Sequence, residues 1–247
     1  MMNDITVIFN GYKRPANLKE QFDAVTASTI QPKNIMYWQN SMPDIQYDNN
    51  YINQCISSLS NTNFGVWSRF YYALNARTNW VCIFDDDTIP GKKWFENCLE
   101  TQNSHPGLHT TIGVIVNHAD YGFERRIGWD GPNEKAELAD FGGHAWFFHR
   151  DMLTHFCREL PPIDHVFSVG EDMHFSWMLQ KYSEYKTWVP PHPISDKEMW
   201  GSLKGWEYGG DCHSTAGSGG IPHMAKYLRY AYDNGFRFLL GDKVRKY

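Results

Sequence analysis

Three consecutive aspartates, Asp85, Asp86 and Asp87, directly follow a short apolar run over residues 80–84. Carboxylates this close repel one another, which destabilises the folded chain unless a cation neutralises them. Carboxylate oxygens are preferred ligands of Mg²⁺ and Mn²⁺, and such an ion can in turn hold a diphosphate. The pattern therefore favours a cation site, although aspartates in an ordinary polar turn remain an alternative.

A second acidic pair, Glu171 and Asp172, follows Gly170 at the start of a predicted helix. Apolar residues at helical spacing predict its buried face: Phe175, Met178, Leu179 and Tyr182. The positive end of a helix favours the ionised form of a carboxyl group, which suits a catalytic carboxylate. Acidic residues are also common in first turns, so position alone does not make this pair a site.

The elements that must position these carboxylates alternate along the first hundred residues. Strands are predicted over 5–9, 35–38 and 80–84, and helices after Pro15 and over 67–76. This order predicts an α/β fold with a mixed, mainly parallel sheet flanked by helices. Ligands in such folds bind outside the carboxyl ends of the strands. We expect the residues that follow strand ends to line one crevice: Asn10, Arg14, Gln39, Asn40 and Asp85 to Asp87.

The second half is less regular. Strands are predicted over 112–116 and 141–148, a short helix over 152–157 and a last helix over 222–233. Residues 200–220, named the glycine-rich segment below, hold seven glycines interleaved with Trp200, Trp206 and Tyr208. A loop of this length without secondary structure is often a lid or binding loop, and disordered segments are usually poor in aromatics. We therefore predict a lid, with a disordered surface loop as the alternative.

Length and composition limit the function classes. The 247 residues carry a net charge of −5 and no basic run, so no nucleic-acid partner is expected. The five cysteines are widely spaced, which makes a disulfide framework or zinc site unexpected. We expect no signal peptide and no membrane span, and a soluble, cytoplasmic protein in one domain.

Three segments resemble nucleotide-sugar glycosyltransferases of the GT-A (Rossmann-like) fold, most closely the exostosin-like group. They are residues 84–88 (FDDDT), 142–148 (GGHAWFF) and 170–173 (GEDM), and their order and spacing are similar to that group. A weaker similarity is the turn Tyr12-Lys13-Arg14 after the first strand. The resemblance covers roughly residues 5–190 and implies sugar transfer from a UDP-sugar.

The resemblance also implies roles for single residues. Asp87 would coordinate Mn²⁺ or Mg²⁺, and Asp85 and Asp86 would share the metal or reach the ribose or donor sugar. Arg14 and Asn40 would lie beside the base, and Asn10 and Tyr12 are further candidates for binding the nucleotide-sugar donor. Arg69 matches an arginine near the donor phosphates. Asp172, with Glu171 beside it, matches the carboxylate near the anomeric carbon, which activates the acceptor or stabilises the reacting centre.

Two C-terminal residues bear on the resemblance. His223 is a candidate for a further metal or phosphate contact, because many GT-A enzymes use a C-terminal histidine in this way. The exostosin-like group has an arginine close to this point, where this chain has Met224. His144 is expected to be a packed or exposed histidine rather than a ligand.

Three other functions stay open. An Asp-x-Asp phosphatase of the haloacid dehalogenase type is disfavoured, because its motif usually follows the first strand. A nucleotide-sugar binder without activity is possible because fold does not dictate function, and Met224 keeps this reading open. A structural module is disfavoured by the charged residues that gather at strand ends.

The resemblance thus implies one GT-A domain, a hexosyl- or N-acetylhexosaminyltransferase that uses Mn²⁺ or Mg²⁺ and a UDP-sugar. The group that it resembles most is retaining, although the same fold also includes inverting enzymes. Residues 1–100 would bind nucleotide and metal. Residues 101–247 would form the site for a glycan or glycolipid acceptor, with the glycine-rich segment as its lid.

Overall fold

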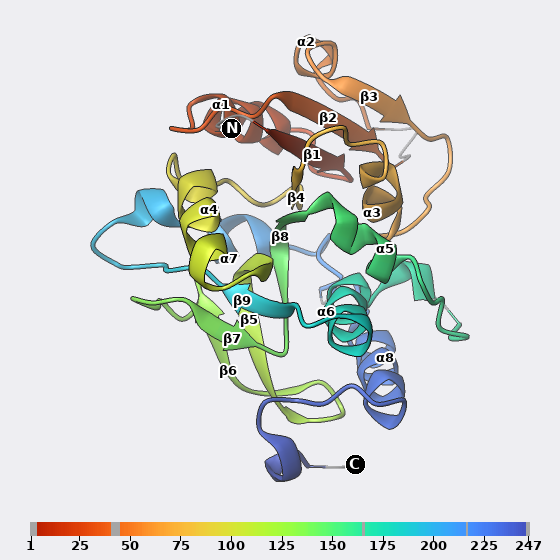
Figure 1. Ribbon diagram of the computed structural model, residues 1–247. Coiled ribbons are helices and arrows are strands. Elements are labelled where there is room, and N and C mark those ends of the chain that lie inside the picture. Colours follow the sequence, from red (N-terminus) through yellow and green to blue (C-terminus); the bar gives the residue numbers. More distant parts are fainter. Residues whose placement is uncertain (1–3, 41–44, 165, 216, 246–247) are drawn as a thin grey trace.

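The computed structural model describes residues 4–40, 45–164, 166–215 and 217–245. They form a mixed α/β domain with a central sheet flanked by helices (Figure 1). The sheet order is β3-β2-β1-β4-β8-β5-β9-β7, and β6 pairs with β5. The strands are β1 Ile5–Gly11, β2 Asn34–Gln39, β3 Ile56–Leu59, β4 Trp80–Phe84, β5 Gly107–His118, β6 Gly122–Gly128, β7 Glu137–Ala139, β8 Phe141–His149 and β9 Lys186–Val189.

Helices cover both faces of this sheet. The α-helices among the described residues are α1 Asn17–Thr26, α2 Asn49–Ile52, α3 Ser68–Ala73, α4 Trp94–Ser104, α5 Leu153–Phe156, α6 Glu171–Tyr182, α7 Gly205–Gly209 and α8 Ile221–Asp233. None of these helices has both the length and the apolarity needed to cross a bilayer. The first three residues, part of the stretch that argued against a signal peptide, lie outside the described residues.

The N-terminal half follows the predicted alternation. Strands β3, β2, β1 and β4 pair with one another in parallel. Strand β4 matches the predicted range, whereas β1 runs two residues further, because Asn10 and Gly11 still pair with β2. Asn10 therefore lies in the end of the strand and not after it. The short α2 and the exposed β3 were not predicted.

The C-terminal half is built largely from antiparallel pairs. Strand β8 runs antiparallel to both β4 and β5, and β6 and β7 are also antiparallel to their partners. Strand β5 is twelve residues long, so the predicted range 112–116 covers only its middle. Helix α6 begins at Glu171 as predicted, and Phe175, Met178 and Leu179 are buried.

The core lies on both faces of β4, whose side chains alternate between them. Val81 and Ile83 pack with α3, α5, α6 and α8, whereas Cys82 and Phe84 pack with α1 and α4. This period of two is what a strand covered on both faces requires. The largest rings, among them Trp67, are fully buried, so much of the aromatic content fills the core. The end of β4 is therefore a rigid support for the aspartates that follow.

The glycine-rich segment differs from its prediction in one respect. It was expected to lack secondary structure, but Gly205–Gly209 forms the short helix α7. Its helical turn is enclosed by neighbours: a Cβ on Gly205 would lie 2.7 Å from the Trp129 ring. Residue 216 of the segment lies outside the described residues. The last helix, α8, starts one residue before the predicted position, with Pro222 in its first turn.

Candidate metal and nucleotide site

The aspartate triplet lies at the carboxyl end of β4, where β8 and α1 fix its backbone. The N–H of Asp85 donates to the carbonyl of His144 at 2.9 Å, which continues the antiparallel pairing of β4 and β8. From α1, the side-chain amide of Gln21 donates to the carbonyls of Asp85 and Thr88 at 2.7 and 2.8 Å. Gln21 is buried, so this polar side chain serves to shape the turn.

Arg14 is the main cation opposite the triplet. Its Nη1 lies 2.5 Å from Asp86 Oδ1 and 3.3 Å from Asp87 Oδ2. The preceding Lys13 has a φ of 67°, an uncommon backbone conformation that costs about 1–3 kcal/mol and is typical of functional sites. Arg14 was expected beside the base, but its guanidinium faces these carboxylates instead, because buried carboxylates need a counter-charge.

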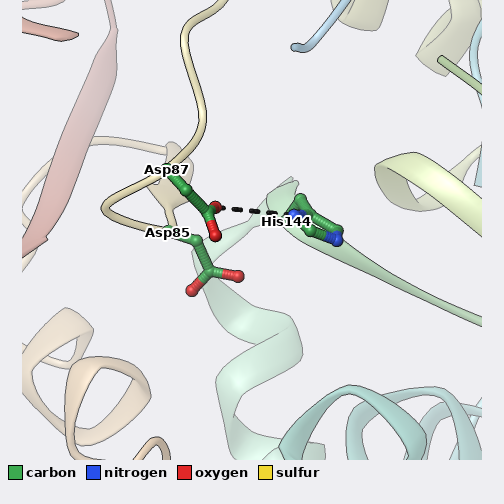
Figure 2. Close-up of side chains that lie close together, drawn as sticks. All are labelled: Asp85, Asp87 and His144. Carbon is green, nitrogen blue, oxygen red and sulfur yellow. Dashed lines mark ion pairs between the residues drawn. The ribbon is translucent and has the colours of Figure 1, made fainter. Parts of the chain in front are cut away.

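Asp85, Asp87 and His144 form a group that could hold a cation. One ligand atom from each lies within 4.8 Å of the others. Figure 2 shows Asp87 and His144 facing one another, with His144 Nδ1 at 3.5 Å from Asp87 Oδ1. Two carboxylates and an imidazole fit a divalent ion, and the imidazole favours Mn²⁺ over Mg²⁺. The structure thus places His144 among possible ligands, against the expectation that it is only a packed or exposed histidine.

The electrostatics of this group suit a cation. Burial acts to raise the pKa of Asp87, but the hydrogen bond and charge of His144, with Arg14, lower it below its usual value. Burial acts in the opposite sense on His144, whose pKa is nevertheless raised by Asp87, Asp85 and Asp172. Burial raises the pKa of Asp86 well above normal despite Arg14. Burial also raises the pKa of Asp85, despite Arg69. A bound cation would favour the charged form of these carboxylates.

Arg69 connects the triplet to the second acidic pair. Its Nη1 lies 2.5 Å from Asp85, and its Nη2 donates to Glu171 at 2.6 Å. The guanidinium is buried and lies 4.7 Å from the Trp146 ring, a cation–π contact. Arg69 was expected near the donor phosphates, but here both of its terminal nitrogens meet carboxylates. Its structural effect is to tie α3 and α6 to the end of β4.

Asp172 stands in the first turn of α6, on a helix that starts at the left-handed Gly170. Its Oδ1 accepts the N–H of Met173 at 2.7 Å. Its Oδ2 lies 3.9 Å from the position of a Cβ on Gly143, so Gly143 leaves space beside the carboxylate. Burial raises the pKa of Asp172 to about 6 and that of Glu171 to about 8. Asp172 is half-buried and is mostly ionised at neutral pH.

A cavity of about 490 Å³ opens beside the triplet. This volume suits a small ligand such as a nucleoside. Four predicted nucleotide-binding residues line it, together with a part of the glycine-rich segment: Asn10, Tyr12, Asn40, His223, His213, Thr215 and residues 218–220. The N–H of Tyr12 donates to Asp86 at 3.2 Å, so this cavity and the triplet are direct neighbours.

Asn40 contributes to the cavity wall in a specific way. Its amide nitrogen donates to Asn63 and to the carbonyl of Gly65, and its oxygen accepts the N–H of Phe64 at 2.7 Å. The side chain is buried, and these bonds fold the loop over residues 63–65 into the wall. Asn40 therefore shapes the wall of the cavity and has little hydrogen-bonding capacity left for a base.

The glycine-rich segment lies over the triplet. The carboxylate of Asp211 accepts two hydrogen bonds from Arg14, one from Nε at 2.9 Å and one from Nη2 at 2.6 Å. A Cβ on Gly209 would lie 3.3 Å from Asp87 and 3.5 Å from the His144 ring. Asp211 was not predicted as a site residue from the sequence. The signal that could have identified it is its acidic side chain within the segment already predicted as a lid.

The position of the triplet also bears on the phosphatase alternative. In that class the motif usually follows the first strand, whereas the triplet follows β4, the fourth strand along the chain. The charged residues at the strand ends also meet in one place, through Arg14 and Arg69, as a site requires.

Comparisons with known proteins identify the fold. No protein-family model matches the sequence, and no curated protein matches it. Among solved structures, TarS 1–349 from S. aureus in complex with UDP-GlcNAc has a TM-score of 0.54 and 16% identity, over 76% of this chain and 56% of that one. The mannosyltransferase PcManGT from Pyrobaculum calidifontis, in complex with GDP-Man and Mn²⁺, has a TM-score of 0.50 and 15% identity, over 92% and 70%.

These identities establish the fold alone, and the chain spans little more than half of the TarS fragment. Both neighbours are glycosyltransferases of the GT-A type, and neither comparison singles out the exostosin-like group. The chain has the mixed α/β architecture of GT-A glycosyltransferases.

Proposed function

We propose that the protein is a metal-dependent glycosyltransferase that moves a sugar from a UDP-sugar to a hydroxyl group of a glycan or glycolipid. One observation carries the proposal: Asp85, Asp87 and His144 gather at the carboxyl end of β4, beside a cavity of nucleoside size. The fold neighbours support it, since TarS is in complex with UDP-GlcNAc and PcManGT with GDP-Man and Mn²⁺.

The chain's own residues would divide the work. Asp85, Asp87 and His144 would hold the ion, which acts as a Lewis acid on the leaving diphosphate. Asp87, now a contact of Arg14, would bind the ion instead, and the Arg14 guanidinium would become available to the diphosphate. Asn10 and Tyr12 would contact the nucleoside from β1, and His223 from α8, within a wall that Asn40 supports. The choice of uracil rests on the resemblance and on the TarS complex.

Asp172 is the proposed catalytic carboxylate, and Glu171 holds Arg69 beside it. In transfer, the acceptor oxygen bonds to the anomeric carbon as the bond to the diphosphate breaks, and the diphosphate keeps the electron pair. With inversion, Asp172 takes the hydroxyl proton. With retention, which the resemblance implies, the departing phosphate oxygen takes that proton and Asp172 stabilises the positive charge at the sugar.

The two halves of the domain would share the nucleotide and metal site. Residues 1–100 supply the triplet and one part of the cavity wall, and residues 101–247 supply the rest of that wall, His144, Asp172 and the acceptor side. The glycine-rich segment over 200–220 would be the lid, since it contacts both the triplet and the cavity. The transferred sugar would be a hexose or an N-acetylhexosamine.

A screen of nucleotides tests the proposal first. UDP, GDP, CDP and TDP are added with and without Mn²⁺ while the midpoint of thermal unfolding is followed. We expect UDP with Mn²⁺ to stabilise most, by about 2.7 kcal/mol at one hundred times its Kd. Release of UDP from UDP-sugars, and the anomeric configuration of the product by NMR, then test transfer. Equal, metal-independent responses to all four nucleotides would contradict the proposal.

A UDP-sugar-binding protein without activity is the second candidate. Met224, where the resembling group has an arginine, is the observation that favours it. Mn²⁺-dependent UDP binding with no transfer to any saccharide, and no hydrolysis of the UDP-sugar, would decide for this candidate.

A further inference from the structure

An exposed tryptophan stands close to the candidate metal group. Trp206, in α7, is 54% exposed, although its indole makes three contacts with neighbouring side chains. Its Nε1 donates to Asp130 Oδ1 at 2.7 Å, the Arg126 guanidinium lies 5.2 Å from its ring, and its ring meets that of Trp129 edge to face at 5.4 Å. An isolated exposed apolar side chain is ordinary, so the position of Trp206 must decide whether it matters.

Two independent routes connect Trp206 to the metal group. The Trp129 ring, which touches Trp206, also meets the His144 ring edge to face at 5.4 Å. Along α7, Gly209 comes three residues after Trp206, about one helical turn, and packs against Asp87. Trp206 is therefore separated from the candidate metal ligands by a single layer of side chains.

Along the order of strands, the nucleoside cavity, the metal group and the residues around Trp206 follow one another. The nucleoside cavity takes residues from β1 and from the end of β2, and the metal group lies at β4 and β8. Beyond them in the sheet come β5 and β6, with Arg126 on β6 and Asp130 just after it. Neighbouring strands lie about 4.8 Å apart, so β1 and β6 are separated by roughly 19 Å. Nucleoside, diphosphate and sugar of a donor, followed by an acceptor, would extend in that direction.

We propose that Trp206, Arg126 and Asp130 form a binding site for a pyranose ring of the acceptor. This rests on the proposed function, because the row of sites has a donor only if the nucleotide binds as described. The ring carbons of a pyranose present an apolar face that fits an indole. Arg126 Nη1 donates to Asp130 Oδ2 at 3.1 Å, so the two side chains hold each other beside the indole. The remaining lone pairs of the Asp130 carboxylate would accept hydrogen bonds from sugar hydroxyls, and the other N–H groups of Arg126 would donate to them. An aromatic wall with a few polar groups is the usual make-up of small-ligand sites.

The same contacts connect α7 to the rest of the domain. Asp130 and Trp129 fix the helix through Trp206, and Asp211 fixes the following turn through Arg14. The acceptor site is thereby shared between the lid and the end of β6. A ligand that bridges the two would stabilise the lid in the position that covers the triplet.

NMR of the tryptophan indole N–H groups tests this site in the intact protein. The chain has 10 tryptophans, and the Trp206 signal is assigned from its loss in Trp206→Phe. The probes are the methyl pyranosides of glucose, mannose and N-acetylglucosamine, added with and without UDP and Mn²⁺, and sorbitol is the acyclic control. We expect at least one pyranoside to shift the Trp206 signal saturably, with an effect larger than that of sorbitol.

Variants separate stacking from general damage. Trp206→Phe, followed through the neighbouring Trp129 indole signal, should keep the saccharide response, whereas Trp206→Ala should weaken binding about tenfold, as expected for loss of one aromatic contact. Ile194→Ala removes another exposed apolar side chain, of 68% exposure, and should leave binding unchanged. Asp130→Asn should weaken binding less than Trp206→Ala does.

The outcomes distinguish this proposal from the one on which it rests. UDP binding with Mn²⁺, together with no pyranoside response at Trp206, would overturn the acceptor site and leave the proposed function standing. A pyranoside response without any UDP binding would show a saccharide site but would overturn its role as an acceptor site. Equal saccharide binding by Trp206→Ala and the unsubstituted protein, followed through the Trp129 indole signal, would also overturn the proposal.

Discussion

Two acidic groups, joined by Arg69, meet at the centre of the molecule in opposite surroundings. The triplet after β4 faces Arg14 and His144 as well as Arg69, and the pKa of Asp87 is lowered. The pair at the start of α6 has an ion pair with Arg69, through Glu171, and burial raises the pKa of Asp172 to about 6.

The difference shows that surroundings, more than residue type, assign a role to a carboxylate. A carboxylate that stays charged among cationic donors is suited to hold an ion. A carboxylate whose pKa lies near neutrality, beside a glycine that adds no side chain next to it, is suited to exchange a proton or to face a developing charge.

The largest effect is expected from Asp87→Ala. Because this side chain is common to the metal group and the contact with Arg14, its loss should abolish Mn²⁺-dependent UDP binding, and transfer with it. Calorimetric titration of UDP with and without Mn²⁺ measures this. Asp151→Ala, at an exposed carboxylate away from the triplet, is the control and should bind as the unsubstituted protein does. Undiminished UDP binding by Asp87→Ala would remove the triplet from the site.

Asp172→Asn should separate binding from chemistry. The amide keeps the shape but cannot be charged, so we expect UDP binding to persist while transfer falls by about 10²–10⁴-fold, the range for loss of an acid–base group. Glu171→Gln is the matched control, since it alters the neighbouring carboxylate and weakens the contact with Arg69. Normal transfer by Asp172→Asn would exclude this carboxylate from the mechanism.

His144→Ala should change the choice of metal. Loss of a residue that only supports a metal ligand lowers metal affinity roughly 10–100-fold. Because His144 would be a ligand itself, its loss should weaken Mn²⁺ binding by at least that factor. Mg²⁺, which prefers oxygen ligands, should be affected less. The measurement is the metal concentration needed for half-maximal UDP binding. Equal losses for both ions would show that His144 acts on the fold or on Asp87 and not as a ligand.

The pH dependence of transfer should identify the working carboxylate. With Asp172 required in its ionised form, kcat/KM should rise with pH through about 6 and level off above it, because the ionised fraction grows as pH passes the pKa. A profile that rises through about 8 would point to Glu171, whose pKa burial raises to about 8. The profile is recorded at saturating Mn²⁺ so that metal binding does not shape it.

The smallest effect is expected from Asp211→Asn at the contact of the lid with Arg14. Arg14 lowers the pKa of Asp211 to about 2, yet Asp211 is more than a third exposed. Solvent-exposed ion pairs contribute about 0.2–1 kcal/mol, so thermal stability should fall by a few degrees at most. Limited proteolysis within 200–220 should accelerate more visibly. Unchanged proteolysis would show that other contacts, such as those of Trp206, hold the lid.

The sequence predicted the N-terminal half of the fold because its signals are local. Runs such as residues 80–84 are apolar, follow one another at α/β spacing and pair in parallel, so their carboxyl ends had to meet. The C-terminal half depends on pairings between distant segments. Nothing in the local pattern of Lys186–Val189 indicates that it joins β5, or that β5 extends to twelve residues.

The site shows the same division. The triplet and the Glu171–Asp172 pair were predicted from their place at element ends. His144 was not, because a histidine inside an apolar strand looks structural, and only the register of β4 with β8 brings it to Asp85. The direction of Arg14 was also missed, since it depends on Asp211, almost 200 residues away.

The most direct test is a crystal structure of the protein with UDP and Mn²⁺, with the ion located by its anomalous scattering. We expect a peak bounded by Asp85, Asp87 and His144, with the diphosphate on the ion and uridine in the cavity beside Tyr12. A peak elsewhere, or an empty group with Asp86 and Asp87 still paired to Arg14 while UDP is bound, would contradict this expectation.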